Sequence, residues 1–144
     1  MLKHILERNN FFSQEVDWKR IKFIRLESEG NLMNLGVILP GESEPSPGIV
    51  LTLQVIHDYL YQPHITVDED LRGKGLATKI YRALIDRLGH LYSGKGRRQN
   101  PIVDKIWAKL RNDNTITCAS SQIGDACWTL DNPDGEDIRN FIEG

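Results

Sequence analysis

The sequence predicts a mixed α/β (α+β) fold with a mainly antiparallel central sheet flanked by helices. Four strand-like segments follow one another between positions 21 and 67, and a strongly periodic helical segment comes directly after them. The chain has 144 residues, of which 40% are hydrophobic and 26% are charged. This size and composition are typical of one globular domain with a buried core. We therefore expect a single domain over residues 1–144.

The four expected strands are joined by turn-forming residues. They span residues 21–26, 32–39, 49–56 and 59–67. The first two form a hairpin around Glu29-Gly30-Asn31, and a polar segment with two prolines, 41–48, leads to the third. Pro63 interrupts the fourth strand and has no N–H to donate. This strand should therefore carry a bulge or diverge from a neighbour at that point.

A long helix is expected over residues 72–88, closed by Gly89. Its apolar residues recur three and four positions apart, at Leu76, Ala77, Ile80, Leu84 and Leu88. A short strand-like segment over 91–93 follows, and Asn100-Pro101 then starts a second helix. The apolar stripe of the second helix holds Ile102, Val103, Ile106, Trp107 and Leu110.

The two ends of the chain are less regular. A closing hairpin is expected over residues 115–120 and 126–130, around Ile123-Gly124-Asp125, with a helical turn over 136–142. About twenty residues precede the first hairpin, and they carry a weak helical face. This order of elements is typical of a sheet domain in which a helix directly follows a strand. It runs from strands to a helix, a short strand, a second helix and the closing strands.

Composition and charge exclude several classes of protein. The net charge of -2 and the pI near 6.1 give no overall field for nucleic acid. No apolar run approaches the roughly 20 residues that cross a bilayer. The first residues include charged side chains where a secretory signal needs an unbroken apolar segment. We therefore expect a cytoplasmic protein with no membrane partner.

The cysteines and the polar residues give no support to hydrolase or metal chemistry. Cys118 and Cys127 are nine positions apart, which fits neither a zinc knuckle nor a redox dithiol motif. We expect both to be reduced and structural. The sequence contains no Ser/His/Asp arrangement, HExxH motif or paired Cys/His cluster, so no metal is expected.

The junction between the fourth strand and the first helix has the features of an anion-binding turn. Gly73 and Gly75 let the backbone approach a ligand closely, and the first N–H groups of a helix have no partner within it. Arg72 and Lys74 add two cations beside the positive end of the helix dipole, which suits a diphosphate. The alternative is a glycine turn whose Arg and Lys are merely solvated. Neither a Rossmann fingerprint nor a P-loop fits these residues.

This junction resembles motif A of the GNAT superfamily of acyl-CoA-dependent N-acyltransferases. The segment 67–77 reads V-D-E-D-L-R-G-K-G-L-A, and Arg72, Gly75 and Ala77 occupy the defined positions of [Q/R]-x-x-G-x-[G/A]. A second motif of the family, N-x-x-A-x-x-L-Y, is matched in register by residues 100–107. The resemblance covers about residues 20 to 130 and implies a sheet whose central strands splay apart.

The resemblance implies a site for coenzyme A. The backbone N–H groups of 72–78 would hold the diphosphate, the strand 65–67 would pair with the pantetheine arm, and Asn100 would touch the same arm. The implied cofactor-binding residues are Ile65, Val67, Arg72, Gly73, Lys74, Gly75, Leu76, Ala77, Thr78 and Asn100. The basic loop Lys95, Arg97 and Arg98 is a weaker candidate for binding the 3′-phosphate. The alternative is that this loop is simply solvated.

The resemblance also implies an activity and its partners. Such proteins move acetyl from acetyl-CoA to a primary amine by direct attack in a ternary complex, so acetyl-CoA is the expected co-substrate. The expected acceptor is an amine of a small molecule or protein. Aminoacyl-tRNA is the one nucleic acid that is kept as an alternative acceptor. A homodimer stays open as well, since dimers are common among relatives. The alternative function is a catalytically degenerate binding module that acts through protein contacts.

Two departures from the family bear on catalysis. Trp107 stands where many relatives have the tyrosine that protonates the leaving thiolate, and an indole is no acid at neutral pH. A thiol with a pKa near 8.5 can still leave as the thiolate, and Tyr61 or Tyr92 could act in its place. Tyr61 and His64 are the candidate bases, although lone residues of these types are more often structural. The short N-terminal region implies an altered or more open acceptor cleft.

Overall fold

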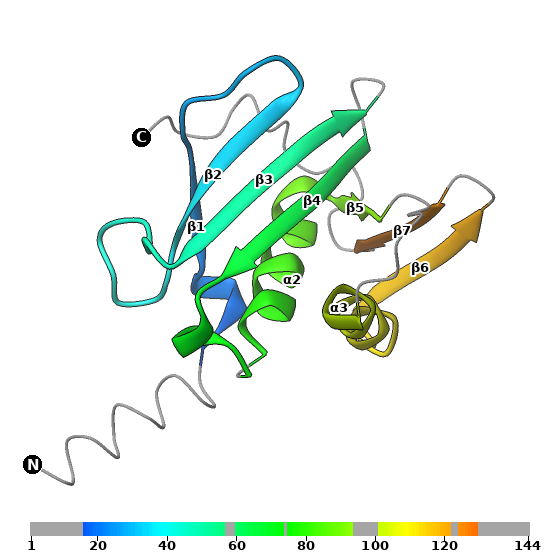
Figure 1. The fold of residues 1–144 in the computed structure, drawn as a ribbon. Coiled ribbons are helices and arrows are strands. Elements are labelled where there is room, and N and C mark those ends of the chain that lie inside the picture. The colour runs from blue at the N-terminus through cyan, green and yellow to red at the C-terminus, as the bar shows by residue number, and fades with distance from the viewer. Residues whose placement is uncertain (1–15, 57–59, 74, 94–100, 122–123, 130–144) are drawn as a thin grey trace, which may run out of the picture.

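The computed structural model describes residues 16–56, 60–73, 75–93, 101–121 and 124–129. Within them the chain forms two antiparallel sheets and two α-helices, which confirms the mixed α+β class (Figure 1). The larger sheet has the order β1-β2-β3-β4, from Lys22–Arg25, Leu32–Ile38, Ile49–Ile56 and Leu60–Val67. The smaller has the order β5-β7-β6, from His90–Tyr92, Gly124–Thr129 and Ile116–Ser121. The helices are α2, Leu76–Leu88, and α3, Pro101–Arg111, and two 3₁₀ turns are η1, Trp18–Arg20, and η2, Glu69–Leu71.

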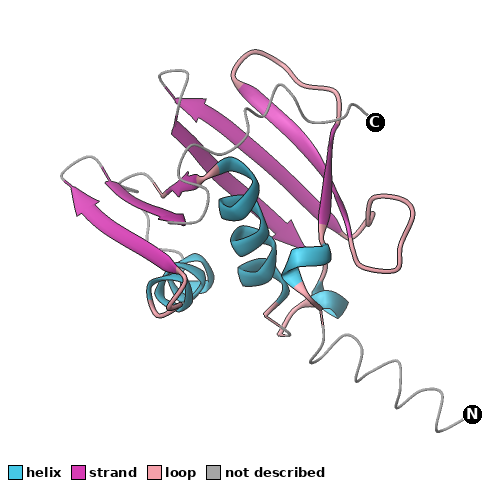
Figure 2. Cartoon of the chain, turned by 180° about the vertical axis from the view of Figure 1, so that it is seen from behind, coloured by secondary structure: helices cyan, strands magenta, loops and turns pink. Residues whose placement is uncertain are grey.

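Helix α2 covers one face of the larger sheet (Figure 2). Its fully buried residues, among them Ile80 and Leu84, join sheet residues such as Leu51 and Leu53 in one apolar cluster. The cluster also contains Cys127 of the smaller sheet, so both sheets share a core. Each fully buried side chain of this kind contributes about 1.5–3 kcal/mol to folding. In the described part of the chain, no helix is long and apolar enough to span a membrane.

Strands β4 and β5 lie side by side but belong to different sheets (Figure 1). The Tyr61 ring stacks on His90, with 5.2 Å between the ring centroids, and the Gln62 side chain donates to the Ser93 carbonyl at 3.3 Å. Pro63 stays in regular register opposite Leu53, so the strand has no bulge there. Pro63 has no N–H to offer β5, and β4 and β5 pair within different sheets, but the expected divergence at Pro63 itself stays a prediction.

Helix α2 begins four residues later than predicted. Gly73 and Gly75 have φ values of 80° and 70°, in the left-handed region that a helix cannot include. Arg72 is extended, and η2 forms a separate turn before it. The expected start at residue 72 was wrong because the apolar periodicity does not report the sign of φ at these glycines.

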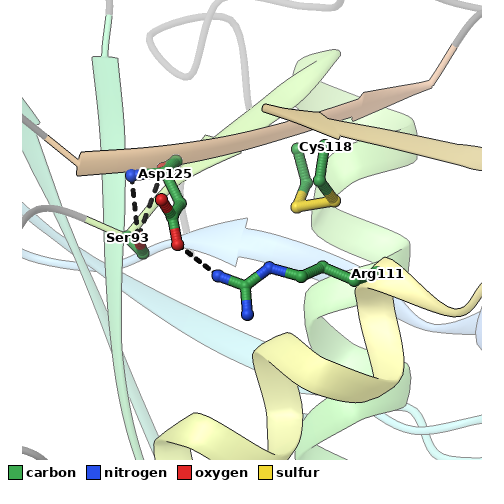
Figure 3. The surroundings of a disulfide bond; sticks show 5 residues. Ser93, Arg111, Cys118 and Asp125 are labelled. Atoms are coloured by element: carbon green, nitrogen blue, oxygen red, sulfur yellow. Dashed lines mark hydrogen bonds and ion pairs between the residues drawn. A yellow bond between two sulfur atoms is a disulfide. The ribbon is translucent and has the colours of Figure 1, made fainter. Parts of the chain in front are cut away.

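The expectation of reduced cysteines was also wrong. Cys118 and Cys127 form a disulfide across the paired strands β6 and β7. Figure 3 shows it near the ion pair of Arg111 with Asp125, where the end of α3 meets β7. The observed register pairs Ser121 with Gly124, so the hairpin turns earlier than predicted. This shift places the two cysteines directly opposite each other.

Candidate functional site

A cavity of about 530 Å³ opens where the end of β4, the start of α2 and one side of α3 meet. Its lining comes from three consecutive parts of the chain: the strand end, the glycine turn with the first helical turn, and α3. The lining residues are Ile65, Thr66, Val67, Leu71, Arg72, Gly73, Gly75, Leu76, Ala77, Thr78, Val103, Lys105, Ile106 and Lys109. The site therefore combines an apolar strand and helix wall with a polar rim.

The start of α2 offers the cavity backbone donors. Gly75 is the N-cap and has no side chain to satisfy the first turn, and the first intrahelical bond runs from the Lys79 N–H to the Gly75 carbonyl at 3.1 Å. The N–H groups of Leu76, Ala77 and Thr78 thus precede the helical ladder and have no partner within the helix. A Cβ added at Gly75 would meet nothing within 4 Å, so the backbone is open to a ligand.

The outer edge of β4 offers a second set of backbone groups. The Asp68 N–H donates to the Gly48 carbonyl at 2.8 Å, which makes this pair a hydrogen-bonded one in the β3–β4 ladder. Because such pairs alternate along an antiparallel ladder, the N–H and C=O groups of Ile65 and Val67 point away from β3. The Val67 carbonyl accepts from Arg72 Nε at 2.8 Å on that side. Ile65 thus presents its amide and carbonyl at the open edge where β4 borders the cavity.

The charge of the lining is positive. Arg72, Lys105 and Lys109 line the cavity, and no Asp or Glu is among the described lining residues. Arg72 is held in place by its bond to Val67, which leaves its two terminal nitrogens for a ligand. A cationic rim beside a helix N-terminus favours an anion with several oxygens. Among the described residues, no group of three or more His, Cys, Asp or Glu could hold a metal ion.

The cavity brings together eight of the ten residues expected to bind a cofactor. They are Ile65, Val67, Arg72, Gly73, Gly75, Leu76, Ala77 and Thr78. Lys74 and Asn100 lie outside the described residues, as does the basic loop Lys95, Arg97 and Arg98.

The three candidate catalytic residues do not line this cavity. Tyr61 is buried and lies four residues before Ile65 on β4, about 13 Å along the strand. His64 is exposed and, by strand alternation, projects from the face opposite to Ile65. Tyr92 is buried in β5. The structure therefore separates the candidate base His64 from the buried tyrosines.

Trp107 is part of the core, as its apolar stripe predicted. It is 6% exposed, and its ring packs against Tyr81 of α2 at 5.9 Å between centroids. The Tyr81 hydroxyl donates to the Pro63 carbonyl at 3.5 Å, and burial raises the pKa of Tyr81 well above its ordinary value. Tyr81 thus stays neutral and links α2 to β4 at Pro63.

Sequence reasoning missed Tyr81, Lys105 and Lys109. Tyr81 lies beside Ile80 on the apolar stripe of α2, so its burial could have been predicted from periodicity. The two lysines are four positions apart and border the stripe of α3, which puts them on one side of that helix. That spacing alone does not indicate which element they face. Comparison with protein-family models, with curated proteins and with solved structures gave no match.

Proposed function

We propose that this protein is a GNAT-like N-acetyltransferase that moves acetyl from acetyl-CoA to a primary amine. One observation carries the proposal. The described residues of the GNAT-like motif line a single cavity, together with the outer edge of the strand before them. The order of a four-stranded antiparallel sheet, a helix, a short strand, a second helix and a closing hairpin agrees with the same family.

The residues of the cavity fit coenzyme A in chemistry. The N–H groups of Leu76, Ala77 and Thr78, with Arg72, would hold the diphosphate. The outward C=O of Ile65 and the outward N–H of Val67 would bond the amides of the pantetheine arm as a neighbouring strand does, whereas the Val67 C=O already accepts from Arg72 Nε. When bound, acetyl-CoA supplies the acyl group as a thioester.

The chain would assist transfer through its backbone and its polar side chains. The Ile65 N–H faces the open edge and would polarise the acetyl carbonyl. His64, Tyr61 and Tyr92 remain the candidates for moving the proton of the amine or of the thiol. Trp107 is in the core and would give no proton to the sulfur, so coenzyme A would leave as the thiolate or take its proton from Tyr61 or Tyr92.

A second candidate function is a binding module that keeps the coenzyme site without turnover. Two observations favour it: Trp107 is buried, and the described lining of the cavity contains no carboxylate or imidazole. In this alternative the cavity binds the coenzyme, and the protein acts through contacts with a partner.

A transfer assay separates the two functions. Acetyl-CoA and a panel of small-molecule and peptide amines are mixed with the protein, and the free thiol released is measured. Since Cys118 and Cys127 are joined, the described residues contain no free thiol to disturb the signal. Amine-dependent release that disappears in the double variant Arg72→Ala, Gly75→Glu supports the acetyltransferase. Coenzyme binding without release under any amine supports the binding module.

A further inference from the structure

Two lysines of α3 form a cationic group on the cavity wall opposite the glycine turn. Lys105 and Lys109 are exposed, line the cavity and lie one helical turn apart. Between them Ile106 is buried and turns the same side of α3 toward the cavity. Both lysines therefore belong to the lining of one cavity.

These lysines have no ionic partner among the described residues. Arg111 of the same helix is paired with Asp125, and Arg72 across the cavity is bonded to the Val67 carbonyl. Within the described residues, no ion pair or hydrogen bond joins the side chain of Lys105 or Lys109 to another residue. Lys109 is in the last turn of α3, where the helix dipole favours a cation, but Lys105 is in mid-helix and gains little from it.

The cations of the cavity therefore fall into two separate groups. One is the start of α2 with Arg72, whose donors suit a diphosphate. The other is the lysine pair on α3. A phosphate monoester carries a charge of about -1.5 to -2 at pH 7, and two ammonium groups match it. Coenzyme A has both kinds of phosphate, the diphosphate and the 3′-phosphate.

We propose that Lys105 and Lys109 bind the 3′-phosphate of coenzyme A, while the start of α2 binds its diphosphate. This inference rests on the proposed function. It moves the 3′-phosphate site from the basic loop Lys95, Arg97 and Arg98, where the sequence suggested it, to the wall of the cavity formed by α3. The lysine pair thus selects a coenzyme that carries the monoester over one that lacks it.

Calorimetric titration of the full chain with coenzyme A and with 3′-dephospho-coenzyme A tests this proposal. The parent is expected to bind coenzyme A about tenfold more tightly, because two charge-assisted contacts are lost with the phosphate. The variant Lys105→Gln, Lys109→Gln is expected to bind both probes with the same affinity. The preference of the parent should shrink as salt is raised.

A variant with a matched charge change serves as the control. The pair Lys19→Gln, Lys22→Gln removes two exposed lysines that do not line the cavity, and it should keep the preference. Equal binding of the two probes by the parent would overturn the proposal, while leaving the coenzyme site in place. The proposal would also be overturned by a second result. In that result, the preference for coenzyme A survives in the variant Lys105→Gln, Lys109→Gln but is lost in the variant Lys95→Gln, Arg97→Gln, Arg98→Gln. A parent that binds neither probe would overturn the proposed function itself.

Discussion

The ring and the hydroxyl of Tyr81 contribute unequally to the stability of the fold. The ring fills the space between α2 and Trp107, whereas the hydroxyl reaches the Pro63 carbonyl only at 3.5 Å. We expect Tyr81→Phe to lower the free energy of unfolding by less than about 1 kcal/mol. Tyr81→Ala should lower it by about 3–5 kcal/mol because it leaves a cavity. Urea unfolding of both variants checks this, and a similar loss in both would mean that the hydrogen bond dominates.

The ionisation of Asp113 makes the free energy of unfolding depend on pH in the acid range. Burial would raise the pKa of Asp113, but hydrogen bonds from the Thr115 hydroxyl and N–H, together with the charge of Arg82, outweigh it and lower that pKa. A lowered carboxyl pKa stabilises the fold above the unfolded value of about 3.9, and this contribution is lost as pH falls through the folded value. We expect Asp113→Asn to be less stable than the parent at pH 7, with a smaller difference at pH 3. Urea titrations at the two pH values measure it, and a gap that does not narrow on acidification would contradict this account.

Residues in a local sequence motif were predicted correctly as lining the cavity, whereas residues placed by register or by packing were not. Arg72, Gly73 and Gly75 were predicted as site residues from a local sequence motif, and all three line the cavity. The disulfide was missed because it depends on the register of a hairpin, and a small shift of the turn changes every partner. Lys105 and Lys109 were missed because their place in the cavity lining depends on the packing of α3 against the rest of the chain.

The hairpin β6–β7 supports one wall of the cavity. It packs against α3, and Asp125 of β7 pairs with Arg111 at the end of that helix. The disulfide closes a loop of nine positions, which stabilises the folded state by about 2–3 kcal/mol in the chain-entropy account. We expect the variant Cys118→Ala, Cys127→Ala to lose about that much.

A thiol reductant provides the control for this prediction. Urea unfolding of the parent should shift to lower denaturant when the reductant is added, whereas the double alanine variant should not respond. If the reductant does not change the urea midpoint of the parent, the disulfide contributes nothing to stability under these conditions.

At the scale of elements, most strands and helices could be predicted from periodicity and turn residues. The start of α3 at Pro101 was predicted from Asn100-Pro101 and is confirmed. The start of α2 and the hairpin turn could not be predicted, because they depend on the sign of φ at glycines and on register. Pro63 was informative, since its missing N–H predicted that β4 would part from a neighbour. The sequence did not indicate which strand that neighbour is, and in the structure β5, which lies beside β4, belongs to the other sheet.

For the molecule as a whole, the parting of two sheets over a shared core creates the candidate site. Within the described sheets, strand β4 pairs only with β3, because β5 pairs with β7 instead. Helix α2 starts at the end of β4, and α3, beside α2, completes the hollow (Figure 1). A strand edge, a helix start and a cationic wall thus meet at one place, although they come from distant parts of the chain.

The measurement that tests this account most directly is calorimetric titration of the parent and Gly75→Glu with acetyl-CoA and coenzyme A. Glutamate would place a negative charge at the helix start, so we expect binding by the parent and at least about a 100-fold loss in the variant. Gly41→Glu is the matched control, because Gly41 also has a positive φ, of 84°, and open space around it but does not line the cavity. It should bind as the parent does. Unchanged affinity in Gly75→Glu, or no binding by the parent, would contradict a coenzyme site at this helix start.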